Sequence, residues 1–304
     1  MSLARSALHP HTAEELATMI RESTDGLRIR GAGHWMHVGQ PVRAGNELHL
    51  GAFAGIRSYT PGDLTITVGA ATTLAELDAA VGAQGQWCPL LPWGDDSGTV
   101  GATLATASAG PFSTTLGRPR DLTLGIECVD GRGRIIRAGG RVVKNVAGFD
   151  LTRLMVGAWG TLGVITEVHL RLRAKPSADA TFYIEGHEAT ALRAFAQSSP
   201  TVLAALPLGD AGTRALGLEG HGAWLLRLGG NAAAVRDAQT RLSALGACKE
   251  VDAAAWTTVR RELAPAPRTA HWHWTPLALR IKSLFDPTGQ LNPGLLGDGA
   301  ELAA

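Results

Sequence analysis

A short alternating run, Leu27 to Arg30, leads directly into the glycine-rich string RGAGHWMHVG at positions 30–39. Successive small residues after a strand let neighbouring main-chain N–H groups point into one concavity, which can bind phosphate oxygens without side-chain charge. The dinucleotide fingerprint of Rossmann folds needs G-x-G-x-x-G at the opening of a helix. Here the spacing differs and no helix of sufficient length follows. We therefore expect a pyrophosphate-binding loop outside a Rossmann fold, with a glycine-rich hairpin turn as the alternative.

Glycine is abundant throughout the chain, with 38 among 304 residues, against an average near 7%. The glycines are clustered and follow no collagen-like repeat, and clustered glycine lets a backbone approach a ligand closely. Hydrophobic residues make up 45% of the chain and charged residues 18%, which is typical of a globular protein. The formal net charge of +1 argues against a protein that binds nucleic acid by massed phosphate neutralisation.

The three cysteines, Cys88, Cys128 and Cys248, are far apart and form no CxxC pair. This spacing argues against a zinc ribbon or an iron–sulfur cluster, so no metal site is expected. Sparse cysteine is typical of a reducing compartment. The N-terminal residues lack the apolar core of a signal peptide, and no stretch of about 20 apolar residues could span a membrane. We therefore expect a cytoplasmic protein.

Hydrophobic periodicity predicts a small α/β unit followed by a second unit up to about residue 174. Thr12, and Thr72 or Thr73, are candidate caps for the two longer helices. A long structured loop, which is usually functional, is expected at 94–117. The other expected elements are helices at 12–23, 74–84 and 150–155, and strands at 27–30, 64–68, 122–129, 134–138 and 164–172.

The string Lys175-Pro176-Ser177 is a candidate domain boundary. Beyond it the pattern predicts a β-α-β-β-α-β order that suggests a ferredoxin-like sandwich. The proline-rich string at 264–268 ends this unit, and a last helix is expected at 277–285. The expected elements are strands at 181–185, 201–206, 214–219, 223–228 and 247–251, and helices at 188–197, 231–245 and 253–263.

Two further segments suggest ligand binding. The string GDDSGTVGATLATASAGPFSTTLG at 94–117 offers many hydroxyl groups on small residues, and its apolar anchors distinguish it from a flexible linker. The strings VKNVAGFD at 143–150 and WGTLGVIT at 159–166 place two turns and a helix around a strand. By themselves, the last two are also compatible with ordinary turn chemistry.

Taken in order, these strings, together with GRPRDLTLGIECVDGRGRIIRAGG and FDPTGQLNPG, resemble the FAD-binding fold of the vanillyl-alcohol oxidase or PCMH type. The resemblance is strongest to FAD-binding subunits of bacterial glycolate oxidase, the GlcE type. It implies an α+β fold in which a two-subdomain PCMH-type FAD-binding domain at 1–175 is completed by 276–297. A small ferredoxin-like cap domain would occupy 178–270.

The resemblance also implies where FAD would bind. The backbone of residues 31–36 would hold the pyrophosphate, a second segment would line the cofactor, Gly163 and Ile165 would lie near the adenine end, and Asn292 near the flavin ring. The cofactor-binding residues expected from the family are Gly31, Ala32, Gly33, His34, Trp35, Met36, Pro92, Asp96, Thr99, Gly101, Ser108, Gly110, Gly163, Ile165 and Asn292.

The sequence departs from the family pattern in three places, one of which is a cap shorter than the substrate-binding cap of larger relatives, which argues against substrate oxidation by this chain alone. Relatives usually carry serine or threonine at the position of His34, and in other branches of the superfamily a histidine at the matching point is linked covalently to flavin. A covalent FAD at His34 is therefore one hypothesis, and a histidine that only lines the pocket is the alternative. His271 and His273 stand where related subunits carry a Trp-Arg pair. They are the candidate catalytic residues, although a cap strand with outward-facing histidines is the simpler interpretation.

The function implied is an FAD-dependent oxidoreductase, or a subunit of one, that oxidises a small 2-hydroxy acid such as glycolate or D-lactate. Hydride would pass from the substrate to flavin N5. The expected partners are a second flavin subunit and an iron–sulfur subunit, through which the chain would be peripheral to the inner membrane. The histidine-rich catalytic signature of the partner subunit is absent from this sequence, which favours a non-catalytic FAD carrier as one alternative. A stand-alone oxidase that uses oxygen and covalent FAD is the other.

Overall fold

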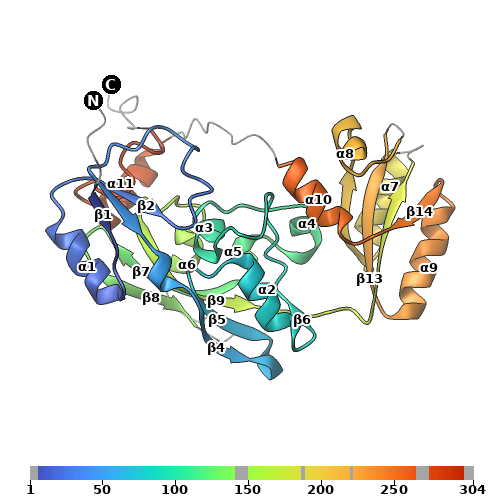
Figure 1. Ribbon diagram of the computed structural model, residues 1–304, viewed down its shortest axis with the longest axis horizontal. Coiled ribbons are helices and arrows are strands. Elements are labelled where there is room, and N and C mark those ends of the chain that lie inside the picture. The colour runs from blue at the N-terminus through green and yellow to red at the C-terminus, as the bar shows by residue number, and fades with distance from the viewer. Residues whose placement is uncertain (1–5, 141–149, 186–188, 220–221, 265–273, 298–304) are drawn as a thin grey trace.

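The computed structural model describes residues 6–140, 150–185, 189–219, 222–264 and 274–297. A three-stranded sheet and a five-stranded sheet with their helices form the larger part of the molecule, and a four-stranded unit lies at one end (Figure 1). The α+β class expected from the sequence is confirmed.

The first sheet is parallel, with the strand order β1–β3–β2. Helix α1 (Ala13–Glu22) begins after Thr12, whose hydroxyl accepts a hydrogen bond from the Glu15 N–H at 3.1 Å, as the sequence predicted. Strand β2 lies at the edge of this sheet, and the chain continues from its end at Arg30 into the glycine-rich loop. The strands are Ser6–Leu8 (β1), Leu27–Arg30 (β2) and Asn46–His49 (β3).

The second sheet is antiparallel, with the order β4–β5–β9–β7–β8. Its central strands carry fully buried Ile66, Val68 and Val168, which pack into the largest core of the molecule. The predicted hairpin and the predicted strand after residue 163 are confirmed. The strands are Ile56–Thr60 (β4), Thr65–Gly69 (β5), Thr123–Asp130 (β7), Ile135–Gly139 (β8) and Gly163–Arg171 (β9).

A long connection between β5 and β7 covers this sheet. The long structured loop predicted at 94–117 contains two short helices, α3 and α4, that the sequence did not predict. Thr99 caps α3, and Val100 and Leu104 are completely buried against the sheet. The connection contains α2 (Leu74–Gly82), β6 (Gln86–Trp87), α3 (Val100–Ala105), α4 (Ser113–Leu116) and α5 (Pro119–Leu122). Outside the connection, short 3-10 turns precede β5 at Gly51–Phe53 and Pro61–Asp63, and α6 (Leu151–Met155) follows β8.

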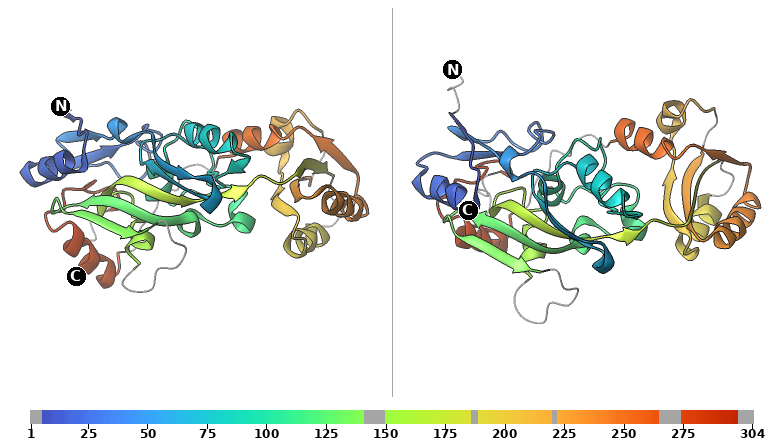
Figure 2. Two further views of the ribbon diagram at one scale, coloured as in Figure 1. Left: turned by 90° about the horizontal axis from the view of Figure 1, so that it is seen from below. Right: turned by 60° about the horizontal axis from the view of Figure 1, so that its bottom comes forward.

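The four-stranded unit, which we call the cap, is antiparallel with the order β12–β13–β11–β14, the arrangement of a ferredoxin-like sandwich. Both views in Figure 2 place it at one end, reached through β10 (Arg173–Ala174), which pairs with β6. The strand predicted at 214–219 is wrong, since α8 packs there against α10. The elements are Ala178–Ile184 (β11), Ala189–Ser198 (α7), Val202–Pro207 (β12), Asp210–Ala215 (α8), Trp224–Gly230 (β13), Ala232–Ser243 (α9), Cys248–Val251 (β14) and Ala255–Glu262 (α10).

The C-terminal segment returns to the first sheet. After α11 (Pro276–Phe285), Leu291 forms a parallel bridge with Leu27. The Leu27 N–H donates to Gln290 O at 2.7 Å, and the Asn292 N–H donates to Leu27 O at 2.9 Å. Residues 290–292 therefore lie beside β2. Within the described ranges, no helix has the length and apolarity needed to cross a bilayer.

Two buried cysteines predict a loss of stability at alkaline pH. Burial raises the pKa of Cys88 and of Cys128 from 9.0 to about 12. The folded state keeps these protons longer, so the stabilising contribution is complete below pH 9 and is lost as the pH rises toward 12. We expect the free energy of unfolding, measured by urea titration, to fall by about 2 kcal/mol per thiol between roughly pH 8 and pH 10.5. Cys128→Ala should flatten this dependence, and an unchanged slope would contradict it.

Candidate cofactor site

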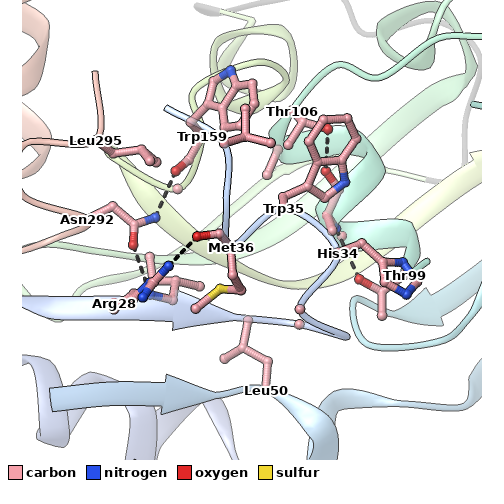
Figure 3. A pocket seen from close by; sticks show the side chains of 18 of the residues that line it. Arg28, His34, Trp35, Met36, Leu50, Thr99, Thr106, Trp159, Asn292 and Leu295 are labelled. Carbon is pink, nitrogen blue, oxygen red and sulfur yellow. Dashed lines mark hydrogen bonds between the residues drawn. The ribbon is translucent and has the colours of Figure 1, made fainter. Parts of the chain in front are cut away.

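A cavity of about 400 Å³ opens where β2 ends (Figure 3). Residues 31–42 form one wall, and the face of α3 that carries Ala102 and Ala105 forms the second. The turn at 159–160 and the start of β9 form the third wall, together with Asn292. Three segments that are distant in sequence therefore meet at one site.

The glycine-rich loop, which forms the first wall of the cavity, contains two tight turns. The Met36 N–H donates to Gly33 O at 3.2 Å, and the Val38 N–H donates to Trp35 O at the same distance. The Arg28 guanidinium donates to Met36 O and holds the loop against β2 (Figure 3). Gly33 has a φ of +94°, which a residue with a Cβ would rarely adopt.

The loop offers unused main-chain donors. Among the described residues, no acceptor meets the N–H groups of residues 32–35. Such groups need a partner when they are covered, and a run of them favours an anion such as a diphosphate. The loop therefore fits the pyrophosphate of a dinucleotide, the ligand group expected from the sequence.

Two glycines allow close packing at the second wall of the cavity, which is formed by α3. A Cβ on Gly31 would lie 2.9 Å from the hydroxyl of Thr99, which caps α3 and accepts from the Ala102 N–H at 3.3 Å. A Cβ on Gly101 would lie 2.8 Å from Ala70 O. The lack of a Cβ at these two positions lets the loop pack closely on α3, and α3 on the residue that follows β5.

Asn292 connects the third wall to β2. Its Oδ1 accepts from the Ile29 N–H, and its Nδ2 donates to Trp159 O, both at 2.9 Å. Gly160, which follows Trp159, has a φ of +70°, and a Cβ there would lie 3.0 Å from the Asn292 Nδ2 atom. Asn292 therefore joins two walls through backbone contacts, a role beyond the proximity to a flavin ring that the resemblance implied.

His34 lies at the edge of the cavity in a chain of polar contacts. Its Nε2 is 3.1 Å from Ser97 Oγ, and the Ser97 hydroxyl donates to Asp95 Oδ1. The Ser97 hydroxyl and its main-chain N–H, by hydrogen bonding to the Asp95 carboxylate, lower the pKa of that carboxyl group. The segment that follows Pro92 therefore sets the orientation of the His34 ring.

An ion pair between β2 and β3 lies beside the glycine-rich loop. Arg30 Nη1 lies 2.8 Å from Glu47 Oε1, and His49 Nε2 lies 3.0 Å from the same oxygen. The hydrogen bond from Arg30 lowers the pKa of Glu47. A Cβ on Gly33 would lie 3.4 Å from Arg30 Nε, so this side chain lies directly under the loop.

The structure brings together most of the residues expected to bind the cofactor. The following line the cavity: Gly31, Ala32, Gly33, His34, Trp35, Met36, Thr99, Gly101, Gly163, Ile165 and Asn292. Pro92, Asp96, Ser108 and Gly110 lie outside its lining. Pro92 and Asp96 face the cap, and Gly110 packs on Leu91 O. His271 and His273 lie outside the described residues.

Sequence reasoning missed several lining residues, notably Arg28, Thr106, Trp159 and Leu295. Trp159 has a positive φ of 55° and meets Trp35 edge to face with ring centroids 5.7 Å apart. Its place in the string WGTLGVIT was the available signal. In the part of the chain that the structure describes, no group of three or more His, Cys, Asp or Glu residues could hold a metal ion.

Residues 4–139 match the family described as FAD binding domain. Their loop at 31–36 and helix α3 form two walls of the cavity. The matched segment, which is less than half of the chain, is similar to FAD-binding domains. The orphan donors of the loop and the closely packed α3 wall fit this cofactor.

The curated relatives of this chain include subunits of glycolate oxidase and a D-lactate dehydrogenase. It is similar to glycolate oxidase subunit GlcE of Escherichia coli (strain K12), with 38% identity over 167 residues, 54% of this chain and 47% of the relative. Glycolate oxidase subunit GlcD of Bacillus subtilis is 32% identical over 59% of this chain and 39% of its own length. D-lactate dehydrogenase of Archaeoglobus fulgidus is 33% identical over 54% and 37%. The chain thus spans less than half of each of these relatives.

Solved structures share the fold. An alkyldihydroxyacetonephosphate synthase superposes with a TM-score of 0.65 at 18% identity, covering 85% of this chain and 54% of that one. A p-cresol methylhydroxylase with substrate bound gives 0.66 at 14% identity, covering 86% and 62%. The PCMH-type fold and the resemblance to glycolate oxidase subunits, both expected from the motifs, are confirmed.

Proposed function

We propose that this chain is the FAD-carrying subunit of an oxidoreductase that oxidises a small 2-hydroxy acid such as glycolate or D-lactate. The observation that carries the proposal is the cavity at the end of β2, because two of its three walls belong to the segment that matches the FAD family. The similarity to glycolate oxidase subunits and a D-lactate dehydrogenase supports the substrate class. The same proposal includes two partners, a second flavin subunit and an iron–sulfur subunit. The complex would be peripheral to the inner membrane, on its cytoplasmic side.

When bound, FAD supplies the two-electron redox chemistry, and the protein supplies position and electrostatics. The main-chain N–H groups of residues 32–35 would hold the pyrophosphate, and Thr99 and Gly101 would line the cofactor beside them. Gly163 and Ile165 would bound the adenine end, and Asn292 and Trp159 would shape the wall nearest the ring. Pro92, Asp96, Ser108 and Gly110 would support the site from the cap side.

Oxidation of a 2-hydroxy acid also needs a group that removes the hydroxyl proton. A base with a pKa near the working pH serves best, and we keep His271 and His273 as the candidates. Histidine has the intrinsic pKa for this role. Electrons would then leave to the iron–sulfur partner.

Turnover by the purified chain tests the function. The chain is loaded with FAD and mixed with glycolate or D-lactate, with either a dye or oxygen as acceptor. We expect bound FAD but no turnover by the chain alone, and turnover when its partner subunits are added. Turnover with peroxide release by the chain alone would overturn the subunit proposal in favour of a stand-alone oxidase. Failure to bind FAD would overturn the proposal altogether.

We further propose that FAD is held without a covalent bond. The His34 Nε2 atom is already engaged by the Ser97 hydroxyl. Acid precipitation of the holoprotein should therefore leave a colourless pellet and release all the flavin into the supernatant. A yellow pellet that becomes colourless in His34→Ala would establish the covalent alternative instead.

A further inference from the structure

Helix α10 of the cap packs Trp256 against Phe112 of the FAD-binding domain and also places one buried arginine against it. Arg260 is only 4% exposed. Its Nε donates to Pro92 O at 2.8 Å, and its Nη2 lies 2.6 Å from Asp96 Oδ1. In return the Gly94 N–H donates to Arg260 O at 2.9 Å. Arg260 therefore binds the segment 92–96 at three points.

The same segment is held by α2 on its other side. The Ala75 N–H donates to Asp96 O, and the Leu74 N–H donates to Gly98 O, both at 2.9 Å. Between these contacts lies Ser97, whose hydroxyl meets the His34 ring. A continuous line of contacts therefore runs from the cap, through residues 92–97, to the glycine-rich loop at the cavity.

We propose that Arg260 is a positioning residue through which the cap orders residues 92–97 and so fixes His34 at the cofactor site. The inference rests on the proposed FAD site, but it concerns this chain's own residues. If α2 alone held residues 92–97, ordering this segment would cost conformational entropy when the ligand binds. A segment that is already ordered by Arg260 binds the ligand without that cost. Arg260 would therefore raise the affinity for FAD without touching it.

The geometry requires arginine. Its planar guanidinium donates in two directions at once, to a carbonyl and to a carboxylate, whereas a lysine ammonium is a point charge on a flexible stem. The next residue provides a matched control. Arg261 lies on the same helix, its side chain is 59% exposed, and it pairs only with Glu262 among the described residues.

The experiment compares Arg260→Met, Arg260→Lys, Asp96→Asn and the control Arg261→Met in the full chain. FAD is titrated into each apoprotein, and its dissociation constant is followed by tryptophan fluorescence. Thermal unfolding of each apoprotein monitors the fold. We expect Arg260→Met to weaken FAD binding about tenfold and Asp96→Asn about threefold. The double variant Arg260→Met/Asp96→Asn should bind FAD no more weakly than Arg260→Met, because the two side chains act through one contact. Arg260→Lys should recover only part of the loss, and Arg261→Met should bind like the wild type.

A second readout needs no cofactor. Ring-¹⁵N histidine spectra of the apoprotein, with the His34 signal assigned through His34→Gln, report the hydrogen bond to Ser97. That signal should shift in Arg260→Met and stay in place in Arg261→Met. An unmoved His34 signal, or FAD affinity of Arg260→Met within twofold of wild type, overturns the inference. If the wild type itself does not bind FAD, the proposed function fails, while the histidine signal still decides whether Arg260 positions His34.

Discussion

Replacement of Ala102 by phenylalanine should abolish FAD binding while leaving the fold intact. Ala102 lies in α3 on the second wall of the cavity, close to Gly31. A phenyl ring at this position would occupy space that the cofactor needs, and an empty cavity accommodates the ring without the strain of an overpacked core. We expect a loss of at least about 100-fold in FAD affinity, or about 2.7 kcal/mol, measured by fluorescence titration.

The control for this prediction is Ala233→Phe. Ala233 is an exposed residue of α9 in the cap, far along the chain from the cavity. It adds the same side chain to a helix without entering the site, so its FAD affinity should match that of the wild type. FAD affinity of Ala102→Phe within threefold of the wild type would show that the cofactor does not occupy this cavity.

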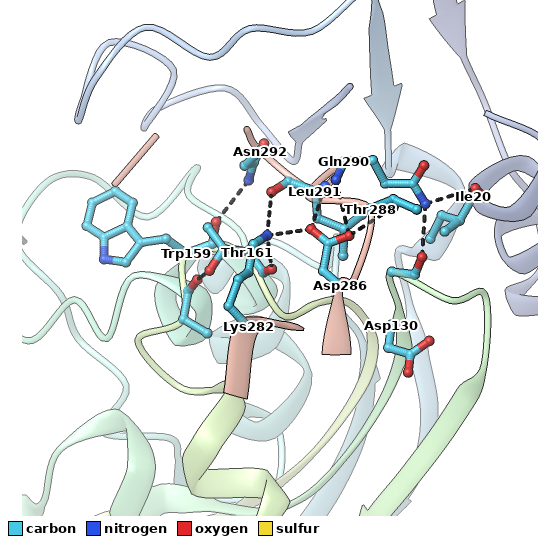
Figure 4. Close-up of polar contacts among 12 residues, drawn as sticks. Ile20, Asp130, Trp159, Thr161, Lys282, Asp286, Thr288, Gln290, Leu291 and Asn292 are labelled. Atoms are coloured by element: carbon cyan, nitrogen blue, oxygen red, sulfur yellow. Dashed lines mark hydrogen bonds and ion pairs between the residues drawn. The ribbon is translucent and has the colours of Figure 1, made fainter. Parts of the chain in front are cut away.

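Of all the substitutions proposed, Asp286→Ala should lower the free energy of unfolding the most. The Asp286 carboxylate is buried, forms an ion pair with Lys282, and accepts hydrogen bonds from the N–H groups of Gln290 and Leu291 at 3.1 and 2.9 Å (Figure 4). Lys282 Nζ also donates to Thr161 O at 2.7 Å. Burial lowers the pKa of Lys282, and Asp286 opposes this shift. Removing one partner of a buried pair costs about 3–5 kcal/mol, which urea unfolding would measure near neutral pH.

Asp237→Ala provides the comparison. Asp237 and Arg241 are also four residues apart on a helix, but their side chains are 70% and 51% exposed. An exposed pair of this kind contributes about 0.5 kcal/mol or less. Equal losses in the two variants would mean that burial does not set the strength of the Asp286 pair. Because Asp286 holds the turn that leads to Asn292, Asp286→Ala should also weaken FAD binding.

Local patterns predicted most of the elements that shape the site. The strand before the glycine-rich loop, the hairpin of β7 and β8 and the capped helix α1 all follow from periodicity and capping residues close together in sequence. Helix α3 was not predicted, because its small residues carry no clear apolar period. It forms where Val100 and Leu104 find a core to enter.

The strand predicted at 214–219 shows the converse error. Its alternation is too short to distinguish a strand from a helix and turn, and packing against α10 decides for α8. The family resemblance implied that Pro92 and Asp96 line the cofactor. In the folded chain both are bound by Arg260, 164 residues from Asp96 in sequence.

The glycine-rich loop after β2 led to the expectation of a pyrophosphate-binding loop, because a run of main-chain donors is a property of neighbouring residues, whereas the resemblance supplied FAD as the ligand. The cavity itself needed the folded chain. Asn292 reaches Ile29 from 263 residues away, and Lys282 reaches Thr161 across 121. Such contacts depend on how the sheets, α11 and the cap dock, and docking is decided by the packing of whole surfaces, which no local periodicity encodes.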